Sequence, residues 1–266
     1  MATLEWTFRE AQEYGRTLLI GHLPAGFPDM AGSIRALRVL SRSVDVLEVG
    51  LPQPNRELDG PDLYDASRRA VAAGTTAMDA IEVLREVASS VDIPVLLRSY
   101  WHPIRLLGPA AAASALADAG AAGAVLPDLH PHSQGAARWL LASARHRLVT
   151  PFTAAVGQTY SAAGLSTGWV HLPLSTDSAG DLDVELLRAR AWRIASMSLA
   201  PVCAGGDFLR PNQVARIAPA VDAVEISAPF VRAVQLALTD RNFQLLDQCA
   251  SDYSEAVRAR ASGQAA

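Results

Sequence analysis

Two acids that could perform general acid–base chemistry lie in residues 44–61, VDVLEVGLPQPNRELDGP. Glu48 interrupts an apolar run typical of a strand buried on both faces, where a lone carboxylate is costly unless it has a function. Asp59 follows a proline-containing loop that can fold it back toward the strand end. A buried acid and a loop acid can differ in protonation state at neutral pH, as acid–base catalysis requires. We therefore interpret Glu48 and Asp59 as a catalytic pair. The structural alternative is that Glu48 is a satisfied polar residue at a strand end and Asp59 caps a helix that begins at Pro61.

Short apolar runs alternate with segments of helical periodicity, a pattern that predicts a repeated unit of strand followed by helix. Eight such units in 266 residues match a (β/α)8 TIM barrel. We predict a single domain, residues 1–266, with an extra N-terminal helix from the amphipathic segment 1–16. A doubly wound open sheet is the alternative, but it usually has fewer strands and no GxGxxG motif follows the first run. The predicted strands are TLLIGH (17–22), VDVLEVG (44–50), PVLLRSY (94–100), AAGAVLP (121–127), RLVTPFT (147–153), GWVHLPL (168–174), LAPVCAG (199–205) and DAVEIS (222–227).

The C-terminal ends of these strands are the expected place for chemistry, because barrels of this kind carry their active sites on that face. Polar side chains and glycines gather there and predict a polar ring around the two acids. The residues at the strand ends are His22, Glu48, Tyr100 with Trp101 and His102, Asp128, Thr153, His171, Gly205 with Gly206, and Ser227.

Composition excludes several classes of function. All 23 basic residues are arginine, so a lysine Schiff-base aldolase, a pyridoxal-phosphate enzyme and a Walker-type phosphate loop are excluded. The net charge of -4 and interspersed charges give no basic stripe for nucleic acid, and no apolar run is long enough for a membrane span. Cys203 lies in an apolar strand and Cys249 on a terminal helix, which indicates no disulfide framework and favours a cytoplasmic protein.

The six histidines raise the alternative of a divalent-metal site of the kind that metal-dependent aldolases use. The spacing of His130 and His132 argues against it, since residues at i and i+2 of an extended loop point to opposite sides. Two carboxylates suffice for proton transfer. We therefore expect no metal and no cofactor.

Several motifs resemble those of the α subunit of tryptophan synthase, the indole-3-glycerol-phosphate lyase barrel. They occur in the same order as in that family and extend over nearly the whole chain. The resemblance implies a retro-aldol cleavage of indole-3-glycerol phosphate into indole and glyceraldehyde 3-phosphate. In that chemistry Asp59 would interact with the indole N–H, while Glu48 would shuttle protons between C3 and the glycerol hydroxyl, and Tyr100 would line the indole pocket. The matching motifs are PAGFPD (24–29), LEVGLP with LDGP (47–61), RRAVAAGTT (68–76), IPVLLRSYWHPI (93–104), GAVLPDL (123–129) and ISAPFV (226–231).

The pocket and the phosphate loops depart from the family. His22 and His171 stand where the family usually has aromatics in the indole pocket, and the family's GFG motif becomes Ala204-Gly205-Gly206. Gly180 remains where the family offers a backbone N–H to phosphate. The family's glycine-serine pair after strand eight becomes Ile226-Ser227, and a branched residue there can hinder close backbone approach. We expect weakened phosphate binding by backbone N–H groups at Gly180, Gly206 and the helix after Ser227.

The partner and the substrate stay open. Asn55 replaces a family aspartate that communicates with the β subunit, so we expect that partnership to be doubtful and a stand-alone lyase of specialised metabolism to fit as well. The alternative function is a natural-product enzyme that uses the same acids on another, possibly non-phosphorylated, substrate. A catalytically silent barrel is disfavoured, because it has no need for a buried acid.

Overall fold

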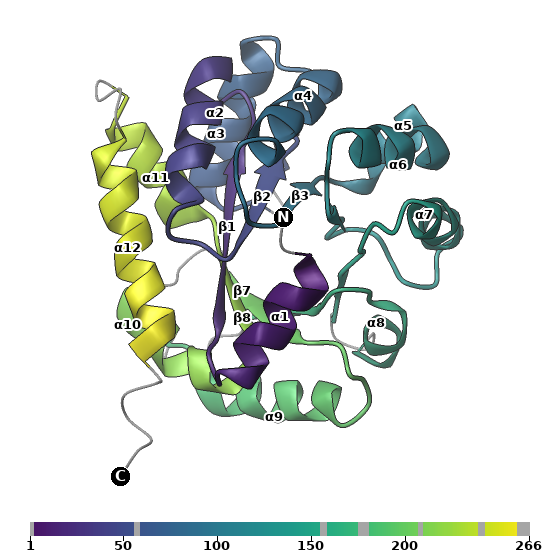
Figure 1. The fold of residues 1–266 in the computed structure, drawn as a ribbon, viewed down its shortest axis with the longest axis vertical. Helices are drawn as coiled ribbons and strands as arrows, with labels where there is room; N and C mark the ends of the chain where they lie inside the picture. Colours follow the sequence, from purple (N-terminus) through teal and green to yellow (C-terminus); the bar gives the residue numbers. More distant parts are fainter. Residues whose placement is uncertain are drawn as a thin grey trace.

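The computed structural model describes residues 3–55, 59–154, 159–174, 181–206, 210–238 and 243–259. Eight parallel strands form one sheet in the order β4-β3-β2-β1-β8-β7-β6-β5, with the helices arranged around it (Figure 1). β4 and β5 have no ladder between them, but an isolated parallel bridge joins Gly123 and Val149 and nearly closes the ring. The predicted barrel and its extra N-terminal helix are confirmed. The strands are β1 Leu18–Pro24, β2 Val46–Gly50, β3 Val95–Arg98, β4 Gly123–Val125, β5 Phe152–Thr153, β6 Val170–Pro173, β7 Val202–Gly205 and β8 Ala223–Ile226.

The helices follow the strands as the periodicity predicts. They are α1 Leu4–Glu13, α2 Met30–Leu40, α3 Pro61–Ala72, α4 Ala77–Ala88, α5 Trp101–Leu107, α6 Pro109–Asp118, α7 Gln134–Arg145, α8 Thr159–Leu165, α9 Val184–Ala195, α10 Pro211–Ile217, the 3-10 turn η1 Ala218–Ala220, α11 Ala228–Leu236 and α12 Gln244–Arg258. No helix in the described part of the chain is long and apolar enough to cross a membrane.

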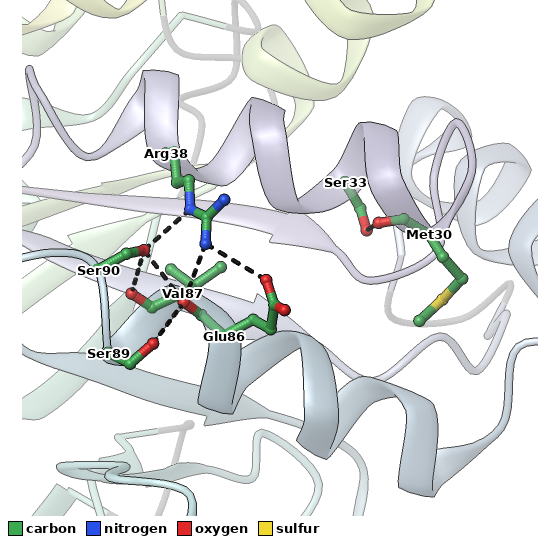
Figure 2. A network of polar contacts seen from close by, with 7 residues as sticks. All are labelled: Met30, Ser33, Arg38, Glu86, Val87, Ser89 and Ser90. Carbon is green, nitrogen blue, oxygen red and sulfur yellow. Dashed lines mark hydrogen bonds and ion pairs between the residues drawn. The ribbon is translucent and has the colours of Figure 1, made fainter.

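Polar contacts connect the neighbouring helices α2 and α4 on the outside of the barrel. Arg38 of α2 reaches the end of α4, where its guanidinium donates to the carbonyl oxygen of Glu86 at 3.3 Å and to Oγ of Ser90, just after the helix, at 2.9 Å (Figure 2). The Glu86 carboxylate lies 3.3 Å from the same guanidinium, and both side chains are about half exposed. This exposed pair joins two outer helices and is not part of the barrel interior, so it offers a control for the buried charges described below.

The two faces of each strand serve different layers. Leu47 and Val49 belong to the large core between strands and helices, whereas Val46 belongs to a smaller cluster inside the barrel. Because side chains alternate along a strand, Glu48 must share the inward face with Val46. The same alternation turns Arg98 of β3 inward, since Leu96 lies in the inner cluster.

Helix α1 closes the N-terminal end of this interior. It lies across the end of the strands (Figure 1), and its buried residues Leu4 and Phe8 join the inner cluster with Leu18 and Ile20. The Phe8 ring packs 5.9 Å from the ring of Trp169, which is fully buried. The barrel interior is therefore apolar at its N-terminal end and becomes charged toward the opposite end.

Candidate active site

A cluster of three charged side chains occupies the barrel interior just below its C-terminal mouth. The guanidinium Nη1 of Arg98 lies 3.0 Å from Glu48 Oε2 and 2.6 Å from Glu225 Oε1, so one nitrogen contacts both carboxylates. Glu48 is fully buried and Glu225 is 5% exposed. Strand register produces this meeting, because Gly50 pairs with Arg98 while Gly205 and Ile20 both pair with Glu225. We call Glu48, Arg98 and Glu225 the charged triad.

Burial gives the two carboxylates of the triad opposite tendencies. Burial and the nearby charge of Glu225 raise the pKa of Glu48 to about 8, although Arg98 works against this. Burial also works to raise the pKa of Glu225, but the charge of Arg98 and its hydrogen bond lower that pKa below its usual value. At neutral pH the proton therefore lies on Glu48 and the negative charge on Glu225.

Two neutral histidines flank the triad. Burial, assisted by Arg98, lowers the pKa of His22 to about 3. Its Nδ1 lies 2.8 Å from Ser227 Oγ, while its Nε2 is buried and has no hydrogen-bond partner in the part of the chain that the structure describes. Burial also lowers the pKa of His171, whose Nδ1 lies 3.4 Å from Glu225 Oε2 without a hydrogen bond between them.

Asp59 is held at the rim by a tyrosine and a backbone amide. Tyr100 Oη donates a hydrogen bond to Asp59 Oδ1, and the Asn55 N–H donates to Oδ2 at 2.9 Å. Burial and this bond to Asp59 raise the pKa of the Tyr100 phenol above its usual value, so the phenol keeps its proton. The structural alternative for Asp59 fails, because Gly60 is the N-cap of α3 and no side-chain capping bond is found there among the described residues.

Two adjoining clefts open at the mouth and share Asp59, Arg98 and Tyr100. The small cleft is also lined by His22, Gly50 and the partly buried Gln53, whose buried Oε1 has no hydrogen-bond partner among the described residues. The large cleft has a volume of about 300 Å³. Its further lining includes Thr153, His171, Gly205, Gly206, Glu225 and Ser227.

Three residues that the sequence predicted for the site, Glu48, Asp128 and Ile226, line neither cleft. Glu48 lies beneath, in contact with Arg98, which is 22% exposed and lines both clefts. Asp128 is exposed and accepts a hydrogen bond from the Trp101 N–H at 2.8 Å, so it caps α5. Ile226 is fully buried in the large core between strands and helices, which we call the outer core, on the helix side of β8. Gly180 lies outside the described residues.

The sequence prediction missed Arg98 and Glu225. Both are charged residues inside apolar strand runs, which is the same signal that singled out Glu48. The prediction took the last polar residue of each run, Tyr100 and Ser227, instead of the residues that share the inward face with Glu48. Among the described residues no group of three or more His, Cys, Asp or Glu side chains is placed to hold a metal ion.

Comparison with known proteins relates the chain to one family over nearly its full length. The family model for the tryptophan synthase alpha chain matches residues 8–258. The alpha chain of Thermobifida fusca is 33% identical over 272 residues, covering 98% of this chain and 100% of the relative. That of Streptomyces coelicolor is 31% identical and covers 96% of each chain.

Solved structures give the same relationship. Tryptophan synthase from Mycobacterium tuberculosis superposes with a TM-score of 0.84 at 28% identity, covering 97% of this chain and 99% of that one. The alpha subunit from Legionella pneumophila has a TM-score of 0.85 at 22% identity, which supports the fold.

These relatives correct one expectation about partners. They are alpha chains, and the Mycobacterium tuberculosis structures are of tryptophan synthase. The expectation, drawn from Asn55, that a β-type partner is doubtful is therefore wrong. One changed loop residue is weaker evidence than similarity along the whole chain.

The resemblance carried by the sequence motifs is confirmed. With it the expectation of a carbon–carbon lyase prevails over the natural-product alternative, which none of these relatives supports. A barrel with buried Glu48, a rim aspartate and full-length similarity to alpha chains has one consistent assignment: the chain belongs to the tryptophan synthase alpha chain family.

Proposed function

We propose that the protein cleaves indole-3-glycerol phosphate into indole and glyceraldehyde 3-phosphate, as the alpha chain of a tryptophan synthase. The observation that carries the proposal is the full-length family match, residues 8–258. The positions of Glu48 just below the barrel mouth and of Asp59 at its rim support it, because a retro-aldol reaction needs one group that moves a proton and one that stabilises developing positive charge.

Glu48 is the proposed acid and base. With a pKa of about 8 it carries a proton at neutral pH, which it donates to C3 of the indole ring. The carboxylate so formed takes the proton of the glycerol hydroxyl next to C3. The carbon–carbon bond then breaks, its electron pair restores the aromatic ring, and the aldehyde forms. Glu48 ends the cycle protonated, so no external proton donor is consumed.

Asp59 is the proposed partner of the indole N–H. Protonation at C3 places positive charge on the ring nitrogen, and an adjacent carboxylate stabilises that charge. Tyr100 and the Asn55 N–H fix the two oxygens of Asp59, so the carboxylate is positioned before substrate binds. Arranging charge in advance lowers the cost of reorganisation during the reaction.

We propose that phosphate binds in the large cleft near Gly206, Ser227 and the N-terminus of α11, with Gly180 as a predicted further contact. Gly206 and Ser227 line that cleft, and α11 begins at Ala228. A helix N-terminus offers backbone N–H groups and a favourable dipole to an anion. Ile226 does not obstruct this region, since its side chain faces the outer core.

The organisation of the whole protein follows from the same proposal. We propose one barrel domain over residues 1–266, associated with a tryptophan synthase beta chain as the name of its relatives implies. We place the protein in the cytoplasm. Both cysteines are free, which fits a reducing compartment.

Incubation of the purified protein with indole-3-glycerol phosphate tests the activity. Indole release is measured with the chain alone and with a tryptophan synthase beta chain, and we expect release in both cases. Glu48→Gln should lower turnover by roughly 10²-fold to 10⁴-fold, because an amide keeps the shape but cannot shuttle a proton. Glu86→Gln, at the exposed pair of Figure 2, is the matched control and should keep wild-type turnover. Absence of indole in both reactions would overturn the proposal.

A further inference from the structure

Glu225 has no part in the proposed chemistry, yet its carboxylate is the one closer to Arg98 in the charged triad and also faces His171. Its Oε1 lies 2.6 Å from Arg98 Nη1, closer than Glu48 at 3.0 Å. Its Oε2 faces His171 at 3.4 Å. Among the described residues, Glu48 Oε1 and Glu225 Oε2 are both buried without a hydrogen-bond partner, so the two carboxylates differ in their distance to Arg98. One guanidinium thus serves two carboxylates unequally.

Charge balance explains why this inequality matters. Two ionised carboxylates and one guanidinium would leave a net negative charge in a buried space, which is costly. Retaining one proton on the pair of acids makes the triad neutral. The shorter contact favours Glu225 as the ionised partner of Arg98, so the proton is left for Glu48.

We propose that Glu225 is a positioning residue for Glu48 and acts on it through the guanidinium of Arg98. The inference rests on the proposed function only for the role of Glu48 as acid and base. Glu225 neutralises the charge of Arg98. Arg98 therefore holds one oxygen of Glu48 in place without favouring the ionised form of that acid. Arg98 also lines both clefts, so the same side chain connects the buried acid to the space where substrate binds.

Other titratable groups around Glu48 do not supply this charge. In the described part of the barrel interior, β1 contributes His22, β6 contributes His171 and β7 contributes Cys203. Burial lowers the pKa of both histidines and raises that of the Cys203 thiol, so all three are neutral near pH 7. At the rim, Asp59 is bonded to Tyr100. Glu225 is thus the negative charge that faces Arg98 from the inner wall beside Glu48.

Glu225→Gln tests the proposal without relying on turnover. With Glu225 uncharged, Arg98 pairs with Glu48 alone and stabilises its ionised form. In protein carrying ¹³C-labelled glutamate carboxyls, NMR should show a carboxyl that titrates near pH 8 in the wild type and is missing in Glu48→Gln. In Glu225→Gln this titration should occur at a pH lower by about 1 to 3. Glu225→Asp keeps the charge and should stay close to wild type.

The pH profile of kcat gives the second measurement. Glu225→Gln should lose about 10-fold or more at about pH 7.5, where Glu48 would be deprotonated, and recover toward wild type below about pH 6. The exposed control Glu86→Gln should leave both the profile and the titration unchanged. An equal loss at every pH, with the Glu48 titration unmoved, would mean that Glu225 is merely structural and would overturn the proposal.

Arg98→Met provides a second direction in case Glu225→Gln does not fold. Removing the cation leaves two adjacent acids, so Glu48 should titrate at higher pH than in the wild type. An unmoved titration would also overturn the proposal. Since these titrations need no substrate, a wild type that releases no indole but shows them would reject the proposed function and retain the coupling of Glu225 to Glu48.

Discussion

Replacing Glu48 by glutamine should remove a pH dependence from the stability of the whole fold. The pKa of Glu48 is raised from an ordinary value of 4.5 to about 8, chiefly by burial and then by Glu225. The folded state therefore binds a proton that the unfolded state releases at lower pH. The stabilisation from this protonated acid is fully present below about pH 4.5 and is lost as the pH rises toward 8.

The size of the effect follows from the interval between the two pKa values. At about 1.4 kcal/mol per pH unit, the interval from 4.5 to about 8 corresponds to a loss of at most about 5 kcal/mol. Glu225 acts in a different window. Because its pKa is lowered, its stabilisation is present above its ordinary value of 4.5 and is lost only as the pH falls below it. The two contributions can thus be separated by pH.

Urea unfolding of wild type and Glu48→Gln between about pH 5 and pH 9 measures this difference. The free energy of unfolding of the wild type should fall relative to the variant by several kcal/mol across that range, with most of the fall complete near pH 8. Glu86→Gln controls for the loss of a carboxylate from an exposed pair and should follow the wild type. Parallel curves for wild type and Glu48→Gln would show that Glu48 folds in its ionised form, and the reasoning would be refuted.

Three further predictions concern the rim, the glycines and metal. Asp59→Asn should lower kcat/KM by about 10²-fold in an indole-release assay, whereas Asp65→Asn, at an exposed pair on α3, should not; equal activity of both variants would reject the role of Asp59. Gly205→Ala should destabilise the protein by about 1 to 3 kcal/mol in urea unfolding, because the added Cβ would stand 2.8 Å from His171 Cε1. Gly164→Ala, where a Cβ meets nothing within 4 Å, should not be destabilised, and similar losses for the two would contradict the steric account. Dialysis against a strong chelator should leave indole release unchanged; activity lost on chelation and restored by zinc or manganese would show a metal-dependent reaction.

The strands and helices could be predicted because their signal is local. Eight apolar runs bounded by polar and glycine-containing segments correspond to eight strands, although every strand except β1 is shorter than its run, as Val95–Arg98 shows beside residues 94–100. Glu48 could be found because an acid inside such a run is rare. Its neighbours could not be assigned in the same way. Whether the side chain of Arg98 or that of Tyr100 reaches Glu48 depends on which residues pair across strands, and that register is set by the assembled sheet.

Other site residues show where reasoning by position along the chain fails. Asp128 and Tyr100 both stand after strands, but α5 begins directly at Trp101 and uses Asp128 as a cap. Ile226 follows Glu225 immediately and serves the opposite face of β8. The bond between His22 and Ser227 joins residues that are 205 positions apart. Contacts of this kind depend on barrel closure, which no single motif contains.

The pKa of Glu48 should also depend on helix α1, which lies at the N-terminal end of the barrel. The apolar layer beneath the charged triad is sealed from below by Leu4 and Phe8, which pack into the end of the barrel. A chain shortened to begin at Gly15 would admit water to that layer, and hydration favours the ionised form of a buried acid. We expect such a chain to show Glu48 titrating at lower pH in the NMR measurement. An unchanged titration in a folded truncated chain would show that the layer between excludes water by itself. The protonation of the catalytic acid is thus expected to depend on a helix at the opposite end of the barrel, which in the described part of the chain contacts none of the charged side chains of the triad.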